Sequence, residues 1–329
     1  MKAILFTKYG PPDLLEYKEI AKPTIADDQI LVRVRAASVN PVEYRSIGGA
    51  IIVRALAGSG WRKPKDTRLG VDLAGQVEAV GKNVTEFRPG DEVYGASTGS
   101  FAEYVSSFGK SLVPKPKNIS FEQAAAVPVA GITSLQALRD HGQIQPGQKV
   151  LVNGAAGGCG TFTVQLAKAF GAEVTGVCST RNVEMVRSLG ADRVIDYTRE
   201  DFTRCGQRFD LVVDNVGNHS VLEYRRVMES KSTFVQVGAP HGRGIAVLMP
   251  FIMVRVLSPF VSQKLVGFIA RTNKPDLLFL KELIEAGKVT PVIDRCYPLR
   301  EVSEAIRYAQ TLHARAKVVI TPEHSDKAQ

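Results

Sequence analysis

The chain is poor in the residues that build metal centres and disulfide frameworks. Its 329 residues include only four cysteines and five histidines. The cysteines form no C-x-x-C pair, and the histidines are equally scattered; the four thiols are those of Cys159, Cys178, Cys205 and Cys296. These spacings predict free thiols in a reducing compartment and no bound metal.

Long apolar runs are missing as well. The longest stretch without a polar side chain covers residues 244–254 and is interrupted by Pro250, whereas a membrane-spanning helix needs about 18 apolar residues. The first ten residues read as a strand and lack the apolar core of a secretory signal. We therefore expect a cytoplasmic protein without a transmembrane helix.

Basic residues exceed acidic ones by 42 to 33, which gives a net charge of +9. Such a balance favours anionic ligands. The densest basic run, RKPK at residues 62–65, has one neighbouring aromatic residue, Trp61, and no nucleic-acid-binding motif around it. We expect a solvated loop there, with a phosphate or lipid-surface contact as the alternative, and no nucleic-acid partner.

The first 115 residues read as short strands separated by turns. Residues 30–36 (ILVRVRA) and 76–80 (QVEAV) alternate apolar and polar side chains, which is typical of half-buried strands. A further strand over residues 105–113 ends at the PKP sequence of residues 114–116. This spacing of strands and turns predicts an all-β, barrel-like unit.

From about residue 120 strands and helices alternate. Ser120 and Gln123 form a capping-box pattern at the start of a helix, and a second helix is expected over residues 133–141. Apolar strands at 149–153, 173–178, 194–197, 211–214 and 233–238 alternate with helical segments, and the pattern is mixed again after residue 260. Alternation of this kind predicts βαβ units and a parallel sheet.

The sharpest local signal is the sequence VLVNGAAGGCG at residues 150–160, in which a buried strand leads into a glycine-rich turn that opens a helix. Small residues at Gly154, Ala156, Gly157, Gly158 and Cys159 let the backbone approach a pyrophosphate, and the helix N–H groups then face the anion. The spacing is G-x-x-G-x-x-G rather than G-x-G-x-x-G. We predict a dinucleotide-binding turn.

The second strand of this unit indicates which dinucleotide binds. An NAD site places a carboxylate at the end of that strand, but here the strand is followed by Ser179, Thr180 and Arg181. A guanidinium beside hydroxyl groups suits a 2′-phosphate. The residues therefore favour NADPH, although Arg181 could be solvated and Ser179 or Asn182 could simply cap the next helix.

Several motifs in a fixed order make the chain similar to a known superfamily. They are SVNPVEYR at 38–45, GVDLAG at 70–75, RPGDEV at 88–93, VPVAGIT at 127–133, the turn at 154–160, and LGAD at 189–192. On these motifs the chain resembles the medium-chain dehydrogenase/reductases, and among them the zinc-independent quinone oxidoreductases (the zeta-crystallin-like group). The resemblance covers nearly the whole chain.

The resemblance implies an α/β fold in which a Rossmann domain, a doubly wound parallel sheet, is inserted into a GroES-like β-barrel domain. We place the GroES-like domain at residues 1–124, the Rossmann domain at 125–265 and a C-terminal return to the first domain at 266–329. The family's active site lies in the cleft between the two domains.

Zinc members of the superfamily place a Cys and a His where this sequence has Asn40 and Val71. The four-cysteine zinc lobe is absent too. Without a Lewis acid, the acceptor must already be electron-poor, such as a quinone or an α,β-unsaturated carbonyl compound. The protein then supplies positioning, exclusion of water and a hydrogen-bond donor for the developing oxyanion.

The resemblance also assigns individual residues. Asn40 matches a position near the nicotinamide and substrate, and Tyr44 could donate a proton to an acceptor oxygen. The alternative for this segment is that Tyr44 packs while Glu43 pairs with Arg45. The resemblance places the remaining cofactor contacts, beyond the glycine turn and Ser179 and Arg181, at Thr133, Tyr197, Asn215, Val216, Gly217, Val237, Gly238 and Lys317.

Together these observations predict an NADPH-dependent, zinc-free reductase of quinones or other electron-poor carbonyl compounds. The alternatives are an alkenal or enoyl reductase and a non-catalytic NADPH-binding protein, such as a sensor or a crystallin-like protein. The apolar stretch 244–260 could be a lid, a partner surface or a weak membrane-surface contact, or it could pack internally. Either a monomer or a homodimer is compatible with the sequence.

Overall fold

The computed structural model describes residues 1–48, 63–240, 249–311 and 314–323. Arg62 of the basic run and residues 244–248 of the apolar stretch lie outside these ranges. The chain forms two compact units. The first consists of Met1–Val129, Thr272–Glu285 and Pro291–Gln329, and the second of Ala130–Arg271 and Ala286–Thr290. The expected boundaries at 124/125 and 265/266 thus lie five to six residues earlier than those of the structure.

The first unit is the GroES-like domain, built on a seven-stranded sheet in the order β14-β15-β3-β4-β5-β7, with β6 paired to β3. A separate antiparallel hairpin joins β1 to β2. The strands are β1 (Lys2–Leu5), β2 (Glu16–Glu19), β3 (Gln29–Val39), β4 (Asp72–Val80), β5 (Glu92–Ala96), β6 (Tyr104–Phe108), β7 (Leu112–Pro114), β14 (Ile293–Pro298) and β15 (Lys317–Thr321). The helices are α1 (Pro41–Ile47), α3 (Phe121–Ala125), α9 (Lys274–Glu285) and α10 (Val302–Gln310).

Strand β3 organises this unit because it pairs with three other strands. Its first half pairs with β6, its last three residues pair with β15, and β4 runs along nearly its whole length. Alternate side chains of β3, namely Ile30, Val32 and Val34, are fully buried in the barrel core. The pairing of β15 brings the end of the chain beside the end of β3, which positions the first group of site residues.

The single strand expected over residues 105–113 is in fact two strands. Residues Gly109–Ser111 form a 3₁₀ turn between β6 and β7. The break allows β6 to pair with β3 while β7 pairs with β5. Alternation of side chains alone does not show that a strand changes its partner.

The second unit is the Rossmann domain, with a six-stranded parallel sheet in the order β10-β9-β8-β11-β12-β13. The strands are β8 (Lys149–Asn153), β9 (Glu173–Cys178), β10 (Arg193–Asp196), β11 (Phe209–Asp214), β12 (Met228–Gln236) and β13 (Lys264–Gly267). The strand order reverses between β8 and β11, and ligands bind at such a switch point, outside the carboxyl ends of the strands.

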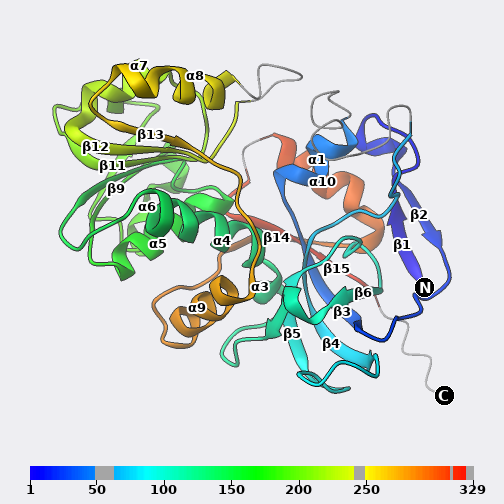
Figure 1. The fold of residues 1–329 in the computed structure, drawn as a ribbon. Coiled ribbons are helices and arrows are strands. Elements are labelled where there is room, and N and C mark those ends of the chain that lie inside the picture. Colours follow the sequence, from blue (N-terminus) through cyan, green and yellow to red (C-terminus); the bar gives the residue numbers. More distant parts are fainter. Residues whose placement is uncertain (49–62, 241–248, 312–313, 324–329) are drawn as a thin grey trace. The chain divides into compact units, whose positions relative to one another are not determined.

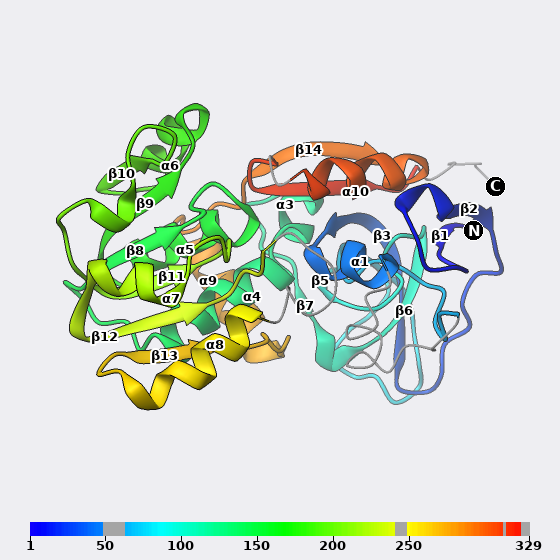
Figure 2. The same ribbon diagram turned by 90° about the horizontal axis from the view of Figure 1, so that it is seen from above.

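Helices cover both faces of the parallel sheet. Figure 1 shows α5 and α6 on one face and α7 and α8 on the other, and Figure 2 shows the same unit from above. The helices are α4 (Pro128–Gln136), α5 (Gly158–Ala169), α6 (Val183–Ser188), α7 (Val221–Tyr224) and α8 (Met249–Leu257). The helix expected over 133–141 begins earlier, at Pro128, a residue that suits a first helical turn, and its continuation at Ala137–His141 is π-helical.

The capping box at the start of α3 is confirmed. The Ser120 hydroxyl accepts the Gln123 N–H at 3.2 Å, and the Gln123 side chain accepts the Ser120 N–H at 3.1 Å. Two backbone donors at the helix start are therefore satisfied locally, which explains why the sequence signals this helix so clearly.

Candidate active site

The GroES-like unit holds a buried polar cluster at the end of β3. Asn40 follows β3 and begins α1, and the pairing of Val318 with Val39 places Lys317 next to it. The Lys317 Nζ lies 2.5 Å from Asn40 Oδ1 and 3.3 Å from the Val39 carbonyl oxygen. Two predicted site residues that are 277 positions apart in the sequence are thus hydrogen-bonded.

Asp72 at the start of β4 is the centre of this cluster. Its Oδ2 accepts from the Ser38 hydroxyl at 2.7 Å and from Asn40 Nδ2 at 3.0 Å, and it lies 3.4 Å from Lys317 Nζ. Its Oδ1 accepts the Val129 N–H at 2.9 Å. The side chain is fully buried. Sequence reasoning used the segment around Asp72 as a family motif but missed Asp72 as a site residue.

Glu43, in the first turn of α1, is the second buried carboxyl group of the cluster. Its Oε2 accepts the Asn40 N–H at 2.7 Å, and its Oε1 is buried with no hydrogen-bond partner among the described residues. Burial, together with the negative charge of Asp72, raises the pKa of Glu43 to about 8. Neighbouring Tyr44 is partly buried and packs against the barrel core.

Glu43 makes stability depend on pH in a direction that can be tested. The folded protein holds a proton on Glu43 between pH 4.5 and about 8, while the unfolded chain does not, so stability falls as pH rises through this range. We expect a loss of about 4 kcal/mol between pH 5 and pH 8, at about 1.4 kcal/mol per pKa unit. Glu43→Gln has no proton to lose, so its thermal unfolding should lack this fall. Parallel profiles for the two proteins would contradict the assignment.

The Rossmann unit holds a second buried cluster, at the carboxyl ends of β8, β11 and β12. Asp214 ends β11 and is fully buried. Its Oδ1 accepts the Val216 and Gly217 N–H groups and Asn153 Nδ2, each at 3.0 Å, and its Oδ2 accepts from Gln236 Nε2 at 3.2 Å. The carboxylate therefore holds the loop after β11, which contains the predicted residues Asn215, Val216 and Gly217.

The glycine turn after β8 is packed too closely for side chains. A Cβ on Gly160 would lie 2.0 Å from the Gly154 carbonyl oxygen, and one on Gly154, where φ is +73°, would lie 2.6 Å from Val216 Cγ2. On the neighbouring strand ends, a Cβ on Gly238 would meet the Asn215 carbonyl oxygen at 2.1 Å. The turn and the loops after β11 and β12 thus form a backbone cradle at the switch point of the sheet.

This cradle suits a dinucleotide. Helix α5 begins at Gly158 directly after the turn, so the positive end of its dipole favours a phosphate there. Asn215 donates from its backbone and from Nδ2 to the Asn153 carbonyl oxygen, both at 3.1 Å. Its Oδ1 is buried with no hydrogen-bond partner among the described residues, which makes it an acceptor for a donor group on a ligand.

Ser179, Arg181 and Tyr197 lie beyond the adjacent ends of β9 and β10. The Tyr197 N–H donates to the Cys178 carbonyl oxygen at 3.1 Å, and the Tyr197 side chain is exposed. Neither Ser179 nor Asn182 caps the following helical segment through its side chain; instead Asn182 Nδ2 donates to Ser179 Oγ at 3.2 Å. The capping alternative for these two residues is therefore wrong.

Sequence reasoning also missed Asp196, which ends β10 beside this group. Its Oδ2 accepts from the Thr180 hydroxyl at 2.5 Å, its Oδ1 accepts from the Thr198 hydroxyl at 2.7 Å, and Arg199 lies 3.4 Å away. These donors lower the pKa of Asp196, the Thr180 hydroxyl contributing most. The Thr198 N–H also donates to Oδ1, at 3.0 Å. The carboxylate next to Ser179 and Arg181 is therefore surrounded by four donor groups.

Thr133 lies on α4, and its neighbour Ser134 fixes the start of α5. The Ser134 and Thr163 hydroxyls donate to the Cys159 carbonyl oxygen at 2.8 and 3.0 Å. The Ser134 bond holds the first turn of α5 against α4 within the Rossmann unit, and the Thr163 bond lies within α5 itself. The remaining predicted residue, Val237, donates its N–H to the Asp214 carbonyl oxygen at 2.9 Å.

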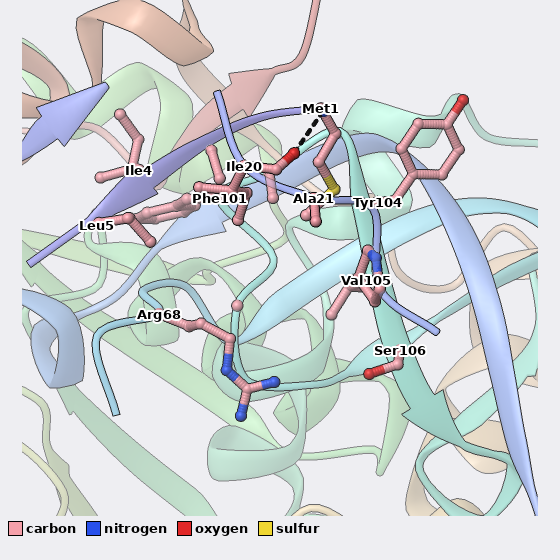
Figure 3. A pocket seen from close by; sticks show the side chains of 14 residues that line it. Met1, Ile4, Leu5, Ile20, Ala21, Arg68, Phe101, Tyr104, Val105 and Ser106 are labelled. Atoms are coloured by element: carbon pink, nitrogen blue, oxygen red, sulfur yellow. Dashed lines mark hydrogen bonds between the residues drawn. The ribbon is translucent and has the colours of Figure 1, made fainter. Parts of the chain in front are cut away.

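A separate cavity of about 160 Å³ lies in the GroES-like unit, between the N-terminal hairpin and the segment around Phe101. Figure 3 shows its apolar lining, with the Arg68 guanidinium nearby and the Met1 amino group donating to the Ile20 carbonyl oxygen at 2.8 Å. Asp66 forms a bidentate ion pair with Arg68. None of the predicted site residues lines this cavity, which is smaller than typical cofactor sites of about 300–1,000 Å³.

In residues 1–48, 63–240, 249–311 and 314–323, no three His, Cys, Asp or Glu side chains gather as a metal site requires. Over the same ranges, no helix has the length and apolar character to cross a membrane.

In α8, which carries part of the apolar stretch, Val254 is buried while Met249, Ile252, Met253 and Val256 are exposed. Most of the described stretch is therefore not packed internally.

Comparisons with known proteins agree with the fold. The alcohol dehydrogenase GroES-like domain family matches residues 26–117, and the zinc-binding dehydrogenase family matches residues 189–320. The chain is 36% identical to 2-methylene-furan-3-one reductase of Solanum lycopersicum, over 98% of this chain and 79% of that protein. It is 35% identical to the chloroplastic NADPH-dependent alkenal/one oxidoreductase of Arabidopsis thaliana, over 98% of this chain and 80% of that protein.

A solved structure matches nearly the whole chain. The quinone oxidoreductase from Coxiella burnetii superimposes with a TM-score of 0.84 at 30% identity, over 98% of this chain and 99% of that one. The fold and these relatives define an oxidoreductase with a GroES-like domain and a Rossmann domain. The chain belongs to the medium-chain dehydrogenase/reductase superfamily, in its zinc-independent, quinone oxidoreductase-like group.

Proposed function

We propose that the protein is a zinc-free reductase that uses NADPH to reduce electron-poor carbonyl compounds. The observation that carries the proposal is the backbone cradle at the switch point of the parallel sheet. There, Gly160 and Gly154 approach so closely that a Cβ on Gly160 would lie 2.0 Å from the Gly154 carbonyl oxygen. A turn of this kind lets a pyrophosphate lie close to the N–H groups at the start of the helix.

Each part of the dinucleotide has residues suited to hold it. Gly154, Ala156, Gly157, Gly158 and Cys159 would hold the pyrophosphate, and Ser179, Arg181 and Tyr197 the adenosine 2′-phosphate. The nicotinamide end would be held by Asn40, Thr133, Asn215, Val216, Gly217, Val237 and Gly238. NADPH, when bound, supplies the hydride, and the chain supplies position and hydrogen bonds.

On the acceptor, Asn40 and Tyr44 are the proposed catalytic residues. An Asn N–H group stabilises the negative charge that develops on the acceptor oxygen. A Tyr hydroxyl can donate a proton to that oxygen. Asn40 and Val71 stand where zinc members carry a Cys and a His. The acceptor must therefore be polarised already, as α,β-unsaturated carbonyl compounds and quinones are.

The relatives favour α,β-unsaturated carbonyl compounds over quinones as the acceptors. The tomato and Arabidopsis proteins are named as reductases of a methylene-furanone and of alkenals and alkenones, whereas the Coxiella protein is named a quinone oxidoreductase. Location in the cytoplasm stays a prediction, because some relatives are named as mitochondrial or chloroplastic proteins. The oligomeric state and a membrane-surface contact through α8 stay predictions as well.

A side-by-side assay tests the proposal. NADPH oxidation would be followed at 340 nm with an alkenal, an alkenone and a benzoquinone, and we expect the highest kcat/KM with one of the first two. A quinone turned over faster than both would support quinone reduction instead. NADPH binding without turnover of any acceptor would support the non-catalytic alternative and contradict the proposed activity.

A variant of Arg181 tests whether this residue binds the 2′-phosphate of NADPH. Arg181→Ala should raise the Kd for NADPH about 10- to 150-fold, because a charge-assisted hydrogen bond to the 2′-phosphate is worth about 1.5–3 kcal/mol. The Kd for NADH, which lacks this phosphate, should not change. Arg187→Ala, which removes an exposed arginine of α6 paired with Glu184, is the control. Equal effects of Arg181→Ala on both cofactors would overturn the 2′-phosphate assignment.

A further inference from the structure

We propose that Lys317 is not a ligand of the cofactor but, together with Asp72, a positioning residue that holds the side-chain amide of Asn40 in one orientation. This inference rests on the proposed function and changes the role that the family resemblance implies for Lys317. It follows from an account of the donors and acceptors in the cluster at the end of β3.

All three protons of the Lys317 ammonium group face an acceptor within the protein. The acceptors are Asn40 Oδ1 at 2.5 Å, the Val39 carbonyl oxygen at 3.3 Å and Asp72 Oδ2 at 3.4 Å. The residue is only 3% exposed. Because an ammonium group has three donors and no acceptor, no proton of Lys317 is left for a phosphate, a ribose or a carboxamide.

The same contacts determine the orientation of Asn40. Its Oδ1 faces a group that can only donate, and its Nδ2 lies 3.0 Å from the Asp72 carboxylate, which accepts. A flipped amide would place N–H groups against the ammonium and oxygen against the carboxylate. Both contacts would be repulsive, so one of the two amide orientations is excluded.

Donors from several elements of the GroES-like unit hold the Asp72 carboxylate in place. Ser38 on β3, Asn40 after β3 and Lys317 on β15 all approach its Oδ2, and the Val129 N–H binds its Oδ1. A carboxylate held by this many donors cannot turn to follow the amide of Asn40. The ion pair is therefore a rigid support for Asn40.

One donor in the cluster remains available to a ligand. The Asn40 Nδ2 has a second proton, whose partner within the protein is the Ser38 carbonyl oxygen at 3.4 Å, a long contact. This N–H group can be given to an acceptor oxygen or to the nicotinamide end at little cost. The charges of Lys317 and Asp72 thus act on the reaction through the amide of Asn40.

Lys317→Met separates the two roles of the lysine. If Lys317 positions Asn40, kcat for the alkenone should fall about 10- to 100-fold through misplacement of the amide, while the Kd for NADPH stays within about threefold. If Lys317 binds the cofactor directly, the Kd for NADPH should rise about tenfold or more, as for a lost charge-assisted bond. This second result would overturn the proposal.

A double-mutant cycle tests whether Lys317 acts through Asn40. On an Asn40→Ala background, Lys317→Met should cause almost no further loss of kcat, because the amide that it positions is already absent. Independent, multiplying effects would contradict the proposal. If Lys317→Met alone fails to fold, the double variant Asp72→Asn/Lys317→Met removes both buried charges and allows the same comparison of kcat with Kd.

Lys115→Met is the matched control. Lys115 is another buried lysine of the GroES-like unit; its Nζ donates to the Pro116 and Ile119 carbonyl oxygens and lies 3.3 Å from Glu92. Its replacement should lower stability without the selective loss of kcat. An equal loss of kcat in both variants would mean that Lys317→Met acts only through a general loss of stability, and it would overturn the proposal.

A last measurement needs neither cofactor nor turnover, so its failure is distinct from failure of the proposed function. The side-chain amide protons of Asn40 should exchange slowly with solvent in the wild-type protein, because the amide is buried and hydrogen-bonded. In Lys317→Met they should exchange at least about tenfold faster. Unchanged protection would show that Lys317 does not hold the amide.

Discussion

Gly160→Ala is expected to destabilise the Rossmann unit and to abolish cofactor binding, although alanine is the better helix former. Gly160 lies in the first turn of α5, where helix propensity alone favours alanine by about 1 kcal/mol. A Cβ at this position, however, would lie 2.0 Å from the Gly154 carbonyl oxygen and 2.8 Å from Ala155 Cα. These neighbours are backbone atoms of the turn, so the helix must move away from β8.

We expect this overpacking to cost about 3 kcal/mol, the upper end of the usual range. The apparent Tm should then fall by about 6–12 °C, at about 2–4 °C per kcal/mol. Gly157→Ala is the control for stability, because its Cβ would lie 3.4 Å from the Gly154 carbonyl oxygen and its φ of −84° suits any residue. A Gly160→Ala protein with wild-type Tm and NADPH affinity would show that the cradle is not close-packed.

Asp214→Ala should have a comparable or larger effect. The substitution removes the acceptor of the Val216 and Gly217 N–H groups in the interior. It also removes one acceptor of the Asn153 and Gln236 side-chain amides, which keep other partners. A buried donor left unsatisfied costs about 1–3 kcal/mol, so the two backbone N–H groups together should cost about 2–6 kcal/mol. The loop after β11 also loses its anchor, so the Kd for NADPH should rise at least about tenfold.

The matched control for Asp214 is Asp210→Ala. Asp210 lies on the same strand, but it is partly exposed, and among the described residues it accepts only from the Lys149 N–H, at 2.9 Å. Its loss should cost about 1 kcal/mol, as for one ordinary hydrogen bond. Denaturant unfolding followed by circular dichroism would compare the two variants. Similar losses for both would mean that Asp214 does not anchor the loop.

The elements that the sequence predicted well are those whose determinants are local. The capping box of Ser120 and Gln123 and the glycine turn after β8 each depend on residues within a few positions of one another. Their side chains and backbone meet the same neighbours in any fold that contains the segment. The two-domain architecture followed from the order of such local segments and from the resemblance of the motifs to a known superfamily.

The centres of the two polar clusters could not be predicted in this way. Asp72 and Lys317 are 245 positions apart, and Asn153 and Asp214 are 61 apart. Nothing near Asp72 in the sequence indicates that four donors will converge on it. For Asp214 a signal was available, since a carboxylate directly after the apolar residues 211–213 must lie at the same edge of a parallel sheet as the glycine turn.

The pairing of β15 with β3 has a consequence for synthesis of the protein. Val318 and Val39 are partners in the barrel sheet, so the support beneath Asn40 cannot assemble on the ribosome until the strand that begins at Lys317 has left the exit tunnel. By then every strand of the Rossmann unit has already been made. The Rossmann unit can thus reach its native state before the support beneath Asn40 is complete.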